Sequence, residues 1–185
     1  MKRACCFTGH RPIKFEFGYD EQYETCTRLK IVLAREIKAM IDAGITTFYT
    51  GMALGADMWC AEIVLSFKRD LPELGIELIA VIPYEEQAAK WSAEYRKRYF
   101  NILDDVQEAI LISQFYTPDC KVRRNRYMVD HSTHLIAVYN GSKGDTHNTL
   151  EYTKSKNIEC VIINPDTLVP KVKKPFLTLI KGDKP

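Results

Sequence analysis

The stretch Thr50-Gly51-Met52-Ala53-Leu54-Gly55-Ala56-Asp57 joins an expected strand at 46–49 to a helical pattern that extends from about residue 56 to residue 68. Its glycines and alanines predict a tight strand-to-helix turn whose backbone can approach a ligand closely. The N-terminus of the following helix would offer free N–H groups and partial positive charge to a phosphate. The stretch is neither a G-x-G-x-x-G fingerprint nor a P-loop, since no Gly-Lys-Ser/Thr follows. A tight turn packed under the helix, with no ligand, is the alternative interpretation.

The carboxylate in this loop needs a separate explanation, because Asp57 would repel a phosphate placed beside it. We expect it to cap the helix, to hold the loop or to contact a ribose hydroxyl. From this loop, Thr50, Gly51, Gly55 and Asp57 are assigned to the candidate ligand site.

On both sides of the loop, short β-rich runs alternate with helical stretches. The expected strands are 4–8, 46–49, 77–82, 109–112, 134–139 and 160–163, and the expected helices are 21–43, 56–68, 85–105, 122–131 and 146–156. Near-continuous apolar strands separated by helices predict an α/β fold with helices on both faces of a parallel sheet. We therefore expect a Rossmann-like three-layer αβα sandwich with a mostly parallel sheet.

The length and composition of the chain fit one domain. Its 185 residues, 46% of them hydrophobic, suffice for one sizeable core. We assign residues 1–165 to a single domain and 166–185 to a basic C-terminal extension, where 176–180 would form either a short strand or a frayed end. The net charge of +2 does not indicate a dominant polyanion-binding surface, although a local basic groove remains compatible with it.

Several features indicate a cytoplasmic protein that does not enter a membrane. The apolar stretch near the N-terminus is too short for a signal peptide, and no run approaches the roughly 20 apolar residues of a membrane span. The six cysteines are scattered without a Cys-x-x-Cys pair, so we expect reduced, buried thiols. His131 and His134 lack a third ligand placed by the sequence, and we expect no metal site.

Other polar residues gather where the remaining strands are expected to end. In open parallel sheets, ligands bind outside the carboxyl ends of the strands, where the strand order switches. Arginine forks suit phosphate, and hydroxyl, amide and backbone groups can donate to it. The further candidate ligand residues are Thr8, Gly9, Arg11, Arg124, Arg126, Asn140, Gly141, Gly144, Thr146, Asn148 and Thr149. Ordinary turns and solvated arginines are the alternative.

Four motifs together resemble the YpsA-like family, a bacterial group of the SLOG superfamily, over about residues 1–165. They are Thr8-Gly9-His10-Arg11-Pro12, the loop 50–57, Arg124-Asn125-Arg126 and the stretch from Gly144 to Tyr152. The resemblance implies a Rossmann-like fold and kinship with DNA-processing protein A and the lonely-guy phosphoribohydrolases. It also implies a small nucleotide-like ligand, such as NAD, ADP-ribose or a nucleoside monophosphate, and no certain cofactor.

The catalytic motif of those phosphoribohydrolases, Pro-Gly-Gly-x-Gly-Thr-x-x-Glu, is only partly matched. If Thr149 is the matching threonine, Tyr152 stands where the glutamate would fall, and Glu151 lies about 100° away around a helix. Glycosidic cleavage needs a carboxylate beside the leaving group or the water. Nucleotide binding or sensing is therefore the first hypothesis.

Two other functions remain as alternatives. N-glycosidic hydrolysis of a nucleoside monophosphate would use Glu151 as acid/base and Arg124 or Arg126 as the phosphate clamp. Single-stranded DNA binding is the second, and the modest net charge disfavours it, since nucleic-acid affinity depends on many cationic contacts. A homo-oligomer is kept among the candidate partners.

Overall fold

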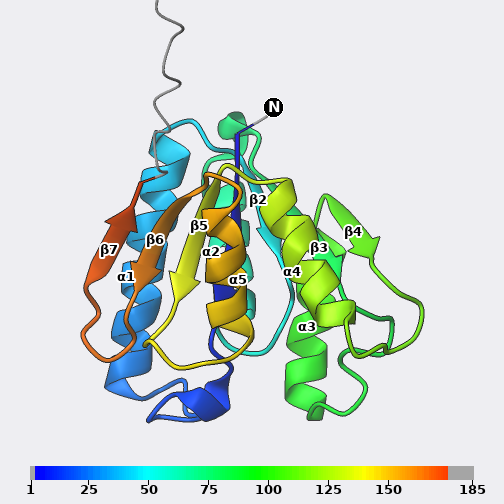
Figure 1. Cartoon of the computed structure of the whole chain (residues 1–185). Coiled ribbons are helices and arrows are strands. Elements are labelled where there is room, and N and C mark those ends of the chain that lie inside the picture. Colours follow the sequence, from blue (N-terminus) through cyan, green and yellow to red (C-terminus); the bar gives the residue numbers. More distant parts are fainter. Residues whose placement is uncertain (1–2, 175–185) are drawn as a thin grey trace, which may run out of the picture.

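The computed structural model describes residues 3–174, which form a single sheet with helices on both faces (Figure 1). The strands are β1 (Ala4–Gly9), β2 (Thr47–Thr50), β3 (Glu77–Ile82), β4 (Glu108–Leu111), β5 (His134–Val138), β6 (Glu159–Ile163) and β7 (Pro170–Lys173). The main helices are α1 (Glu24–Asp42), α2 (Ala56–Asp70), α3 (Ala93–Asp105), α4 (Cys120–Asp130) and α5 (Asp145–Lys154). The expected three-layer α/β architecture with a mostly parallel sheet is confirmed.

The sheet has the strand order β4-β3-β2-β1-β5-β6-β7, and all neighbours are parallel except β6 and β7. The chain runs outward from β1 to β4 in one direction and then returns to place β5 on the other side of β1. The strand order therefore reverses between β1 and β5. The carboxyl ends of these two strands, paired as far as Gly9 and Val138, border the crevice where such folds bind ligands.

The two faces of the sheet carry separate cores. Side chains of β1 alternate between them, so that Phe7 packs against the layer of α1 and α2 while Cys6 packs against the layer of α4 and α5. Figure 1 shows α4 and α5 on the near face and α1 and α2 behind the sheet. On the far side Phe7 stacks on Phe48 with ring centroids 5.9 Å apart, which ties β1 to β2.

The helix expected at 85–105 is shorter than predicted. Residues 84–91 form turns and bends, and α3 begins at Ala93 because Ser92 caps it, accepting a hydrogen bond from the backbone N–H of Tyr95 at 3.4 Å. Trp91 therefore precedes the helix, although its spacing from Tyr95 and Tyr99 imitates a helical face. Smaller shifts of one to three residues affect the ends of α1, α2, α4 and α5.

The sheet extends beyond residue 165, into the segment assigned to the basic extension. β7 pairs antiparallel with β6, with Val172 opposite Val161. Its lysines and proline gave no strand signal, and its exposed residues are typical of an edge strand. The possible strand at 176–180 lies outside the described residues. At the opposite edge, β4 is largely exposed, unlike the buried strand expected there.

Within residues 3–174, no helix is long and apolar enough to cross a membrane. All six cysteines are buried and free, as the sequence predicted.

Candidate functional site

A cleft of about 370 Å³ opens where β1 and β5 end, at the reversal of strand order. We call it the switch-point cleft. Its walls come from the end of β1, the loop before α2, the first turns of α4 and the N-terminus of α5. The lining residues are Thr8, Gly9, His10, Arg11, Ile13, Lys14, Ala53, Asp57, Lys121, Arg124, Asn125, Lys143, Gly144, Asp145 and Thr146.

Arg124 and Asp57 form a buried ion pair in the wall of this cleft. Nη1 of Arg124 lies 3.3 Å from Oδ2 of Asp57, and the two side chains are 7% and 6% exposed. Burial raises the pKa of Asp57 and lowers that of Arg124, while the charge of each partner opposes the shift of the other. The same Asp57 oxygen accepts a hydrogen bond from the backbone N–H of Ala53, so this carboxylate holds the loop.

Gly51 makes room for this pair rather than for a ligand. Nη1 of Arg124 donates a hydrogen bond to the carbonyl oxygen of Gly51. A Cβ atom on residue 51 would overlap the guanidinium and would lie 2.7 Å from Oδ2 of Asp57. The first glycine of the loop is thus required because an arginine from α4 packs against its backbone.

Gly55 and Gly9 also serve packing within the protein. Gly55 has a φ of +92°, and a Cβ there would lie 2.8 Å from the carbonyl oxygen of His10. A Cβ on Gly9 would overlap that of Ala56, so β1 and α2 can approach closely only with glycine at this position. Of the loop residues assigned to the ligand site, only Asp57 lines the cleft. Thr50 is buried and donates to the carbonyl oxygen of Asp57 at 3.0 Å.

The cleft carries an excess of positive charge. Five basic side chains line it, against the two carboxylates of Asp57 and Asp145. The side chains of Arg11, Lys14 and Lys143 have no hydrogen-bond or ion-pair partner among residues 3–174. The N-termini of α2 and α5 point into the same region, since Asp57 lies in the first turn of α2 and Gly144 precedes α5. The arrangement suits an anion.

His10, which the sequence analysis did not select, closes one side of the cleft. Its Nε2 lies 2.8 Å from Oδ1 of Asn140, and burial lowers the pKa of the imidazole, which favours the neutral ring. Oδ1 of Asn140 also accepts from the backbone N–H of Ser142 at 3.1 Å. Asn140 therefore positions the loop after β5, and neither it nor Gly141 lines the cleft.

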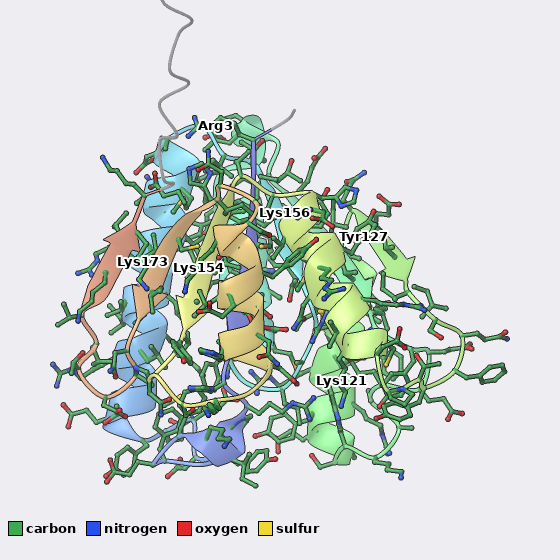
Figure 2. The ribbon with its side chains drawn as sticks, in the orientation of Figure 1. Arg3, Lys121, Tyr127, Lys154, Lys156 and Lys173 are labelled. Atoms are coloured by element: carbon green, nitrogen blue, oxygen red, sulfur yellow. The ribbon has the colours of Figure 1, made fainter. Side chains whose placement is uncertain are left out.

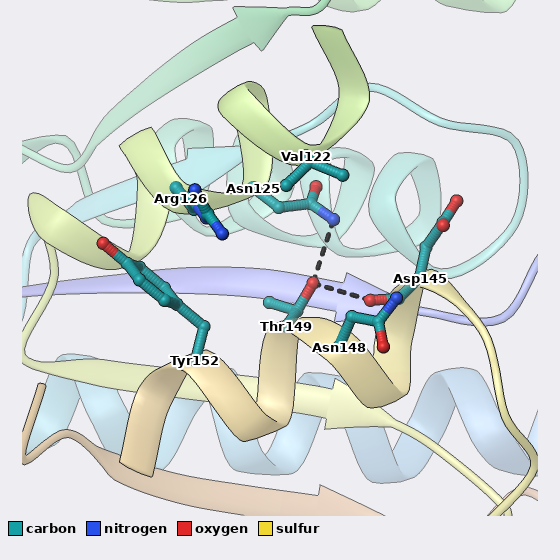
Figure 3. A pocket seen from close by; sticks show the side chains of 7 residues that line it. All are labelled: Val122, Asn125, Arg126, Asp145, Asn148, Thr149 and Tyr152. Atoms are coloured by element: carbon teal, nitrogen blue, oxygen red, sulfur yellow. Dashed lines mark hydrogen bonds between the residues drawn. The ribbon is translucent and has the colours of Figure 1, made fainter. Parts of the chain in front are cut away.

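Several predicted ligand residues line a neighbouring pocket of about 190 Å³ between α4 and α5 (Figure 3). Asn125 donates to Oγ1 of Thr149 at 2.9 Å, and Thr149 donates to the carbonyl oxygen of Asp145 at 2.8 Å, so the hydroxyl is already engaged. Arg126 lies over the ring of Tyr152, 5.3 Å from its centroid. Arg126, Asn148 and Thr149 thus border the α4/α5 pocket, which meets the switch-point cleft at Asn125 and Asp145.

Glu151 lies outside both cavities. Its exposed carboxylate accepts two hydrogen bonds from Lys154, at 2.7 and 2.8 Å, and it borders a groove beside β6 and β7. The structure therefore does not bring Glu151 together with Arg124. Within the described residues, no group of three or more His, Cys, Asp or Glu side chains is placed to hold a metal ion.

Of the predicted ligand residues, the structure gathers Thr8, Gly9, Arg11, Asp57, Arg124, Gly144 and Thr146 around one cleft. The sequence analysis missed three lysines there, Lys14, Lys121 and Lys143. Each lies within three residues of a selected position, so a search for basic residues flanking the expected strand ends would have found them.

The model of the YspA SLOG family (YpsA) matches residues 5–168. An uncharacterised SPbeta prophage-derived protein, YoqJ of Bacillus subtilis, is 35% identical over 122 residues, covering 58% of this chain and 68% of the relative. The UPF0398 protein BH1768 of Halalkalibacterium halodurans is 28% identical over 158 residues, covering 83% of this chain and 82% of the relative.

Two solved structures of DNA processing protein A share the fold. The protein from Streptococcus pneumoniae superposes with a TM-score of 0.56 at 14% identity, and the one from Helicobacter pylori, described for its single-stranded DNA binding mode, with 0.58 at 13%. The match covers 88% of this chain in both cases. This chain spans 50% of the first structure and 66% of the second.

Proposed function

The chain belongs to the YspA SLOG family, and from this premise we propose that it binds the phosphate of a nucleotide-like ligand in the switch-point cleft. The candidate ligands are NAD, ADP-ribose and nucleoside monophosphates. The protein would bind or sense such a molecule.

The observation that carries the proposal is the state of Arg124. Its guanidinium is buried in the cleft wall, and its Nε has no hydrogen-bond partner within residues 3–174. Leaving a buried hydrogen-bond donor without an acceptor costs free energy. An acceptor is therefore expected beside such a group. An anionic oxygen bound beside this guanidinium would offset the burial of its positive charge.

The surroundings of Arg124 support a phosphate in particular. The backbone N–H groups at the start of α5 and the unpaired side chains of Arg11, Lys14 and Lys143 surround the same space. Helix N-termini and lysine or arginine side chains are the groups with which proteins hold phosphate.

We do not extend the proposal to cleavage of a glycosidic bond. Glu151, the residue expected to act as the acid/base, lies outside the cleft and pairs with Lys154. The cleft contains the carboxylates of Asp57 and Asp145, and that of Asp57 is held in an ion pair by Arg124.

A thermal-shift panel tests the proposal. AMP, ADP-ribose and NAD are compared with adenosine, which lacks the phosphate, at low salt. Stabilisation by at least one phosphate compound and none by adenosine at the same concentration is the expected result. Arg11→Met should reduce the shift, whereas Arg126→Met, which removes an arginine outside the cleft, should preserve it. No shift with any phosphate compound at millimolar concentration would refute the proposal.

Binding of single-stranded DNA is a second candidate, favoured by the likeness to the Helicobacter pylori protein. Figure 2 shows Lys154 and Lys156 on the outer side of α5 and just beyond its end, away from Lys121. Both are paired, Lys154 with Glu151 and Lys156 with Asp130 at 2.7 Å, so these two lysines offer little free positive charge. Fluorescence anisotropy with a labelled oligothymidylate at low salt tests this candidate. An absence of binding would remove it.

A further inference from the structure

We propose that the ligand is a nucleotide whose aromatic base lies in a second chamber beside the switch-point cleft, between Tyr19, Tyr84 and Trp91. The inference rests on the proposed phosphate binding and specifies what the rest of the ligand must be.

The chamber adjoins the cleft directly. It has a volume of about 210 Å³ and shares Arg11, Ala53 and Lys121 with the switch-point cleft. A ligand with its phosphate beside Arg124 can therefore pass between Arg11 and Lys121 and place its other end in the chamber. This is the order of groups in a nucleotide, in which the sugar separates the phosphate from the base.

Three of the nine residues that line the chamber are aromatic, and each of these rings contacts another ring outside the chamber. The supporting pairs, with their centroid separations, are Tyr19 with Tyr95 (5.9 Å), Tyr84 with Tyr116 (5.3 Å) and Trp91 with Tyr99 (5.4 Å). Rings held in place before binding lose little conformational freedom when a ligand arrives. Planar bases stack on such surfaces regardless of their hydrogen-bonding edge.

The chamber is also tied to the glycine-rich loop. Nε2 of Gln87, which lines the chamber, donates a hydrogen bond to the carbonyl oxygen of Met52 at 2.9 Å. Met52 is buried with a φ of +54°, an uncommon conformation for a residue with a side chain. The contact fixes the loop that separates the two cavities, and Leu54 from the same loop lines the chamber.

Phosphate alone would leave this half of the site unused. Inorganic phosphate or a sugar phosphate engages the basic cleft but has no group for the three aromatic rings. Trp91 is only partly buried, and Tyr19 is 54% exposed, so both rings present surface that a base would cover. Apolar ring surface removed from water adds to affinity.

Titration calorimetry and tryptophan fluorescence test the inference. The four common nucleoside 5′-monophosphates are titrated beside ribose 5-phosphate, which has the same phosphate and sugar but no base. At least one nucleotide should bind about tenfold or more tightly than ribose 5-phosphate. The same nucleotide should change the fluorescence of Trp91. Trp91→Phe should retain binding and lose this fluorescence change. The other tryptophan, Trp59, is buried in the core and only 1% exposed, so it should not respond to the ligand.

Trp91→Ala should reduce nucleotide affinity to the level of ribose 5-phosphate and leave the affinity for ribose 5-phosphate itself unchanged. Tyr84→Leu is the second variant, in case Trp91→Ala unfolds the protein. Phe115→Ala is the control, because this exposed side chain lies outside the chamber. Equal affinities for nucleotides and ribose 5-phosphate, with unchanged fluorescence, would overturn the base chamber and leave phosphate binding intact. Failure of every phosphate compound to bind would overturn both proposals.

Discussion

The guanidinium of Arg124 occupies the space that a side chain on Gly51 would need, and it donates a hydrogen bond to the carbonyl oxygen of that glycine. The two residues are 73 positions apart in the sequence. Their contact connects α4, on one face of the sheet, to the loop before α2, on the other. The loop therefore shapes the switch-point cleft through an arginine that it holds in place.

Gly51→Ala should destabilise the protein and disrupt the cleft. The added methyl group would displace Arg124 from Asp57, which leaves buried charges with poorer partners. We expect a fall in Tm of several degrees and loss of nucleotide binding. Gly75→Asn is the control, since residue 75 has left-handed geometry and open space around it. A Gly51→Ala protein with unchanged Tm would contradict this account of the loop.

Arg124→Met should cost about 3–5 kcal/mol of unfolding free energy, because Asp57 would remain buried without its partner. Chemical denaturation measures the cost. The double variant Arg124→Met/Asp57→Asn removes both charges and should recover part of the loss. Additive costs of the two single changes would show that the pair is not coupled.

Arg11→Met should weaken nucleotide binding about tenfold without lowering the Tm of the free protein. The side chain of Arg11 is exposed, lines both cavities and has no hydrogen-bond or ion-pair partner within residues 3–174, so its removal leaves the fold unchanged. Calorimetry compares this variant with Arg126→Met. An equal loss in both variants would indicate a general charge effect and not a contact in the cleft.

The stability of the protein should decrease in acid through Glu21. Burial alone would raise the pKa of this carboxyl, but hydrogen bonds from Arg98 and Lys30 outweigh it and lower the pKa to about 2. The stabilisation is therefore complete above the ordinary pKa of a glutamate and is lost as the pH falls toward 2. Urea unfolding of the wild type and Glu21→Gln should differ at pH 6 and converge toward pH 2. A difference that does not depend on pH would contradict the role of the ionised carboxyl.

The thiols should be unreactive in the folded protein. Burial raises the pKa of Cys6 to about 12 and raises those of Cys5 and Cys60 well above the ordinary value. Reaction with a disulfide reagent requires the thiolate. We expect slow reaction under native conditions and six fast thiols in guanidinium chloride. A thiol in the native protein that reacts as fast as free cysteine would show that one of them is accessible.

The sequence was sufficient to predict the alternating strands and helices, because buried parallel strands leave long apolar runs. It also indicated the strand ends, where the structure has the switch-point cleft, as the location of a candidate site. It could not show that Gly51 serves Arg124, since that contact depends on tertiary packing. β7 was missed because an exposed edge strand rich in lysine has no apolar pattern.

The sequence did not predict the chamber, because the spacing of three aromatic residues resembles that of a helix face. Trp91, Tyr95 and Tyr99 follow one another at four-residue intervals, which fitted the single helix expected over 85–105. The cap at Ser92 begins α3 after Trp91, whose ring packs against the core and also lines the chamber. Tyr99 is buried in the core, so periodicity placed that ring correctly but could not show that Trp91 precedes the helix.

The most direct test of the central claim is a crystal structure of the protein with the nucleoside monophosphate that binds best. The account predicts a phosphate in the switch-point cleft, within hydrogen-bond distance of the guanidinium of Arg124 and the backbone N–H groups at the start of α5. A phosphate bound in the α4/α5 pocket beside Arg126, or anywhere else outside the switch-point cleft, would contradict it.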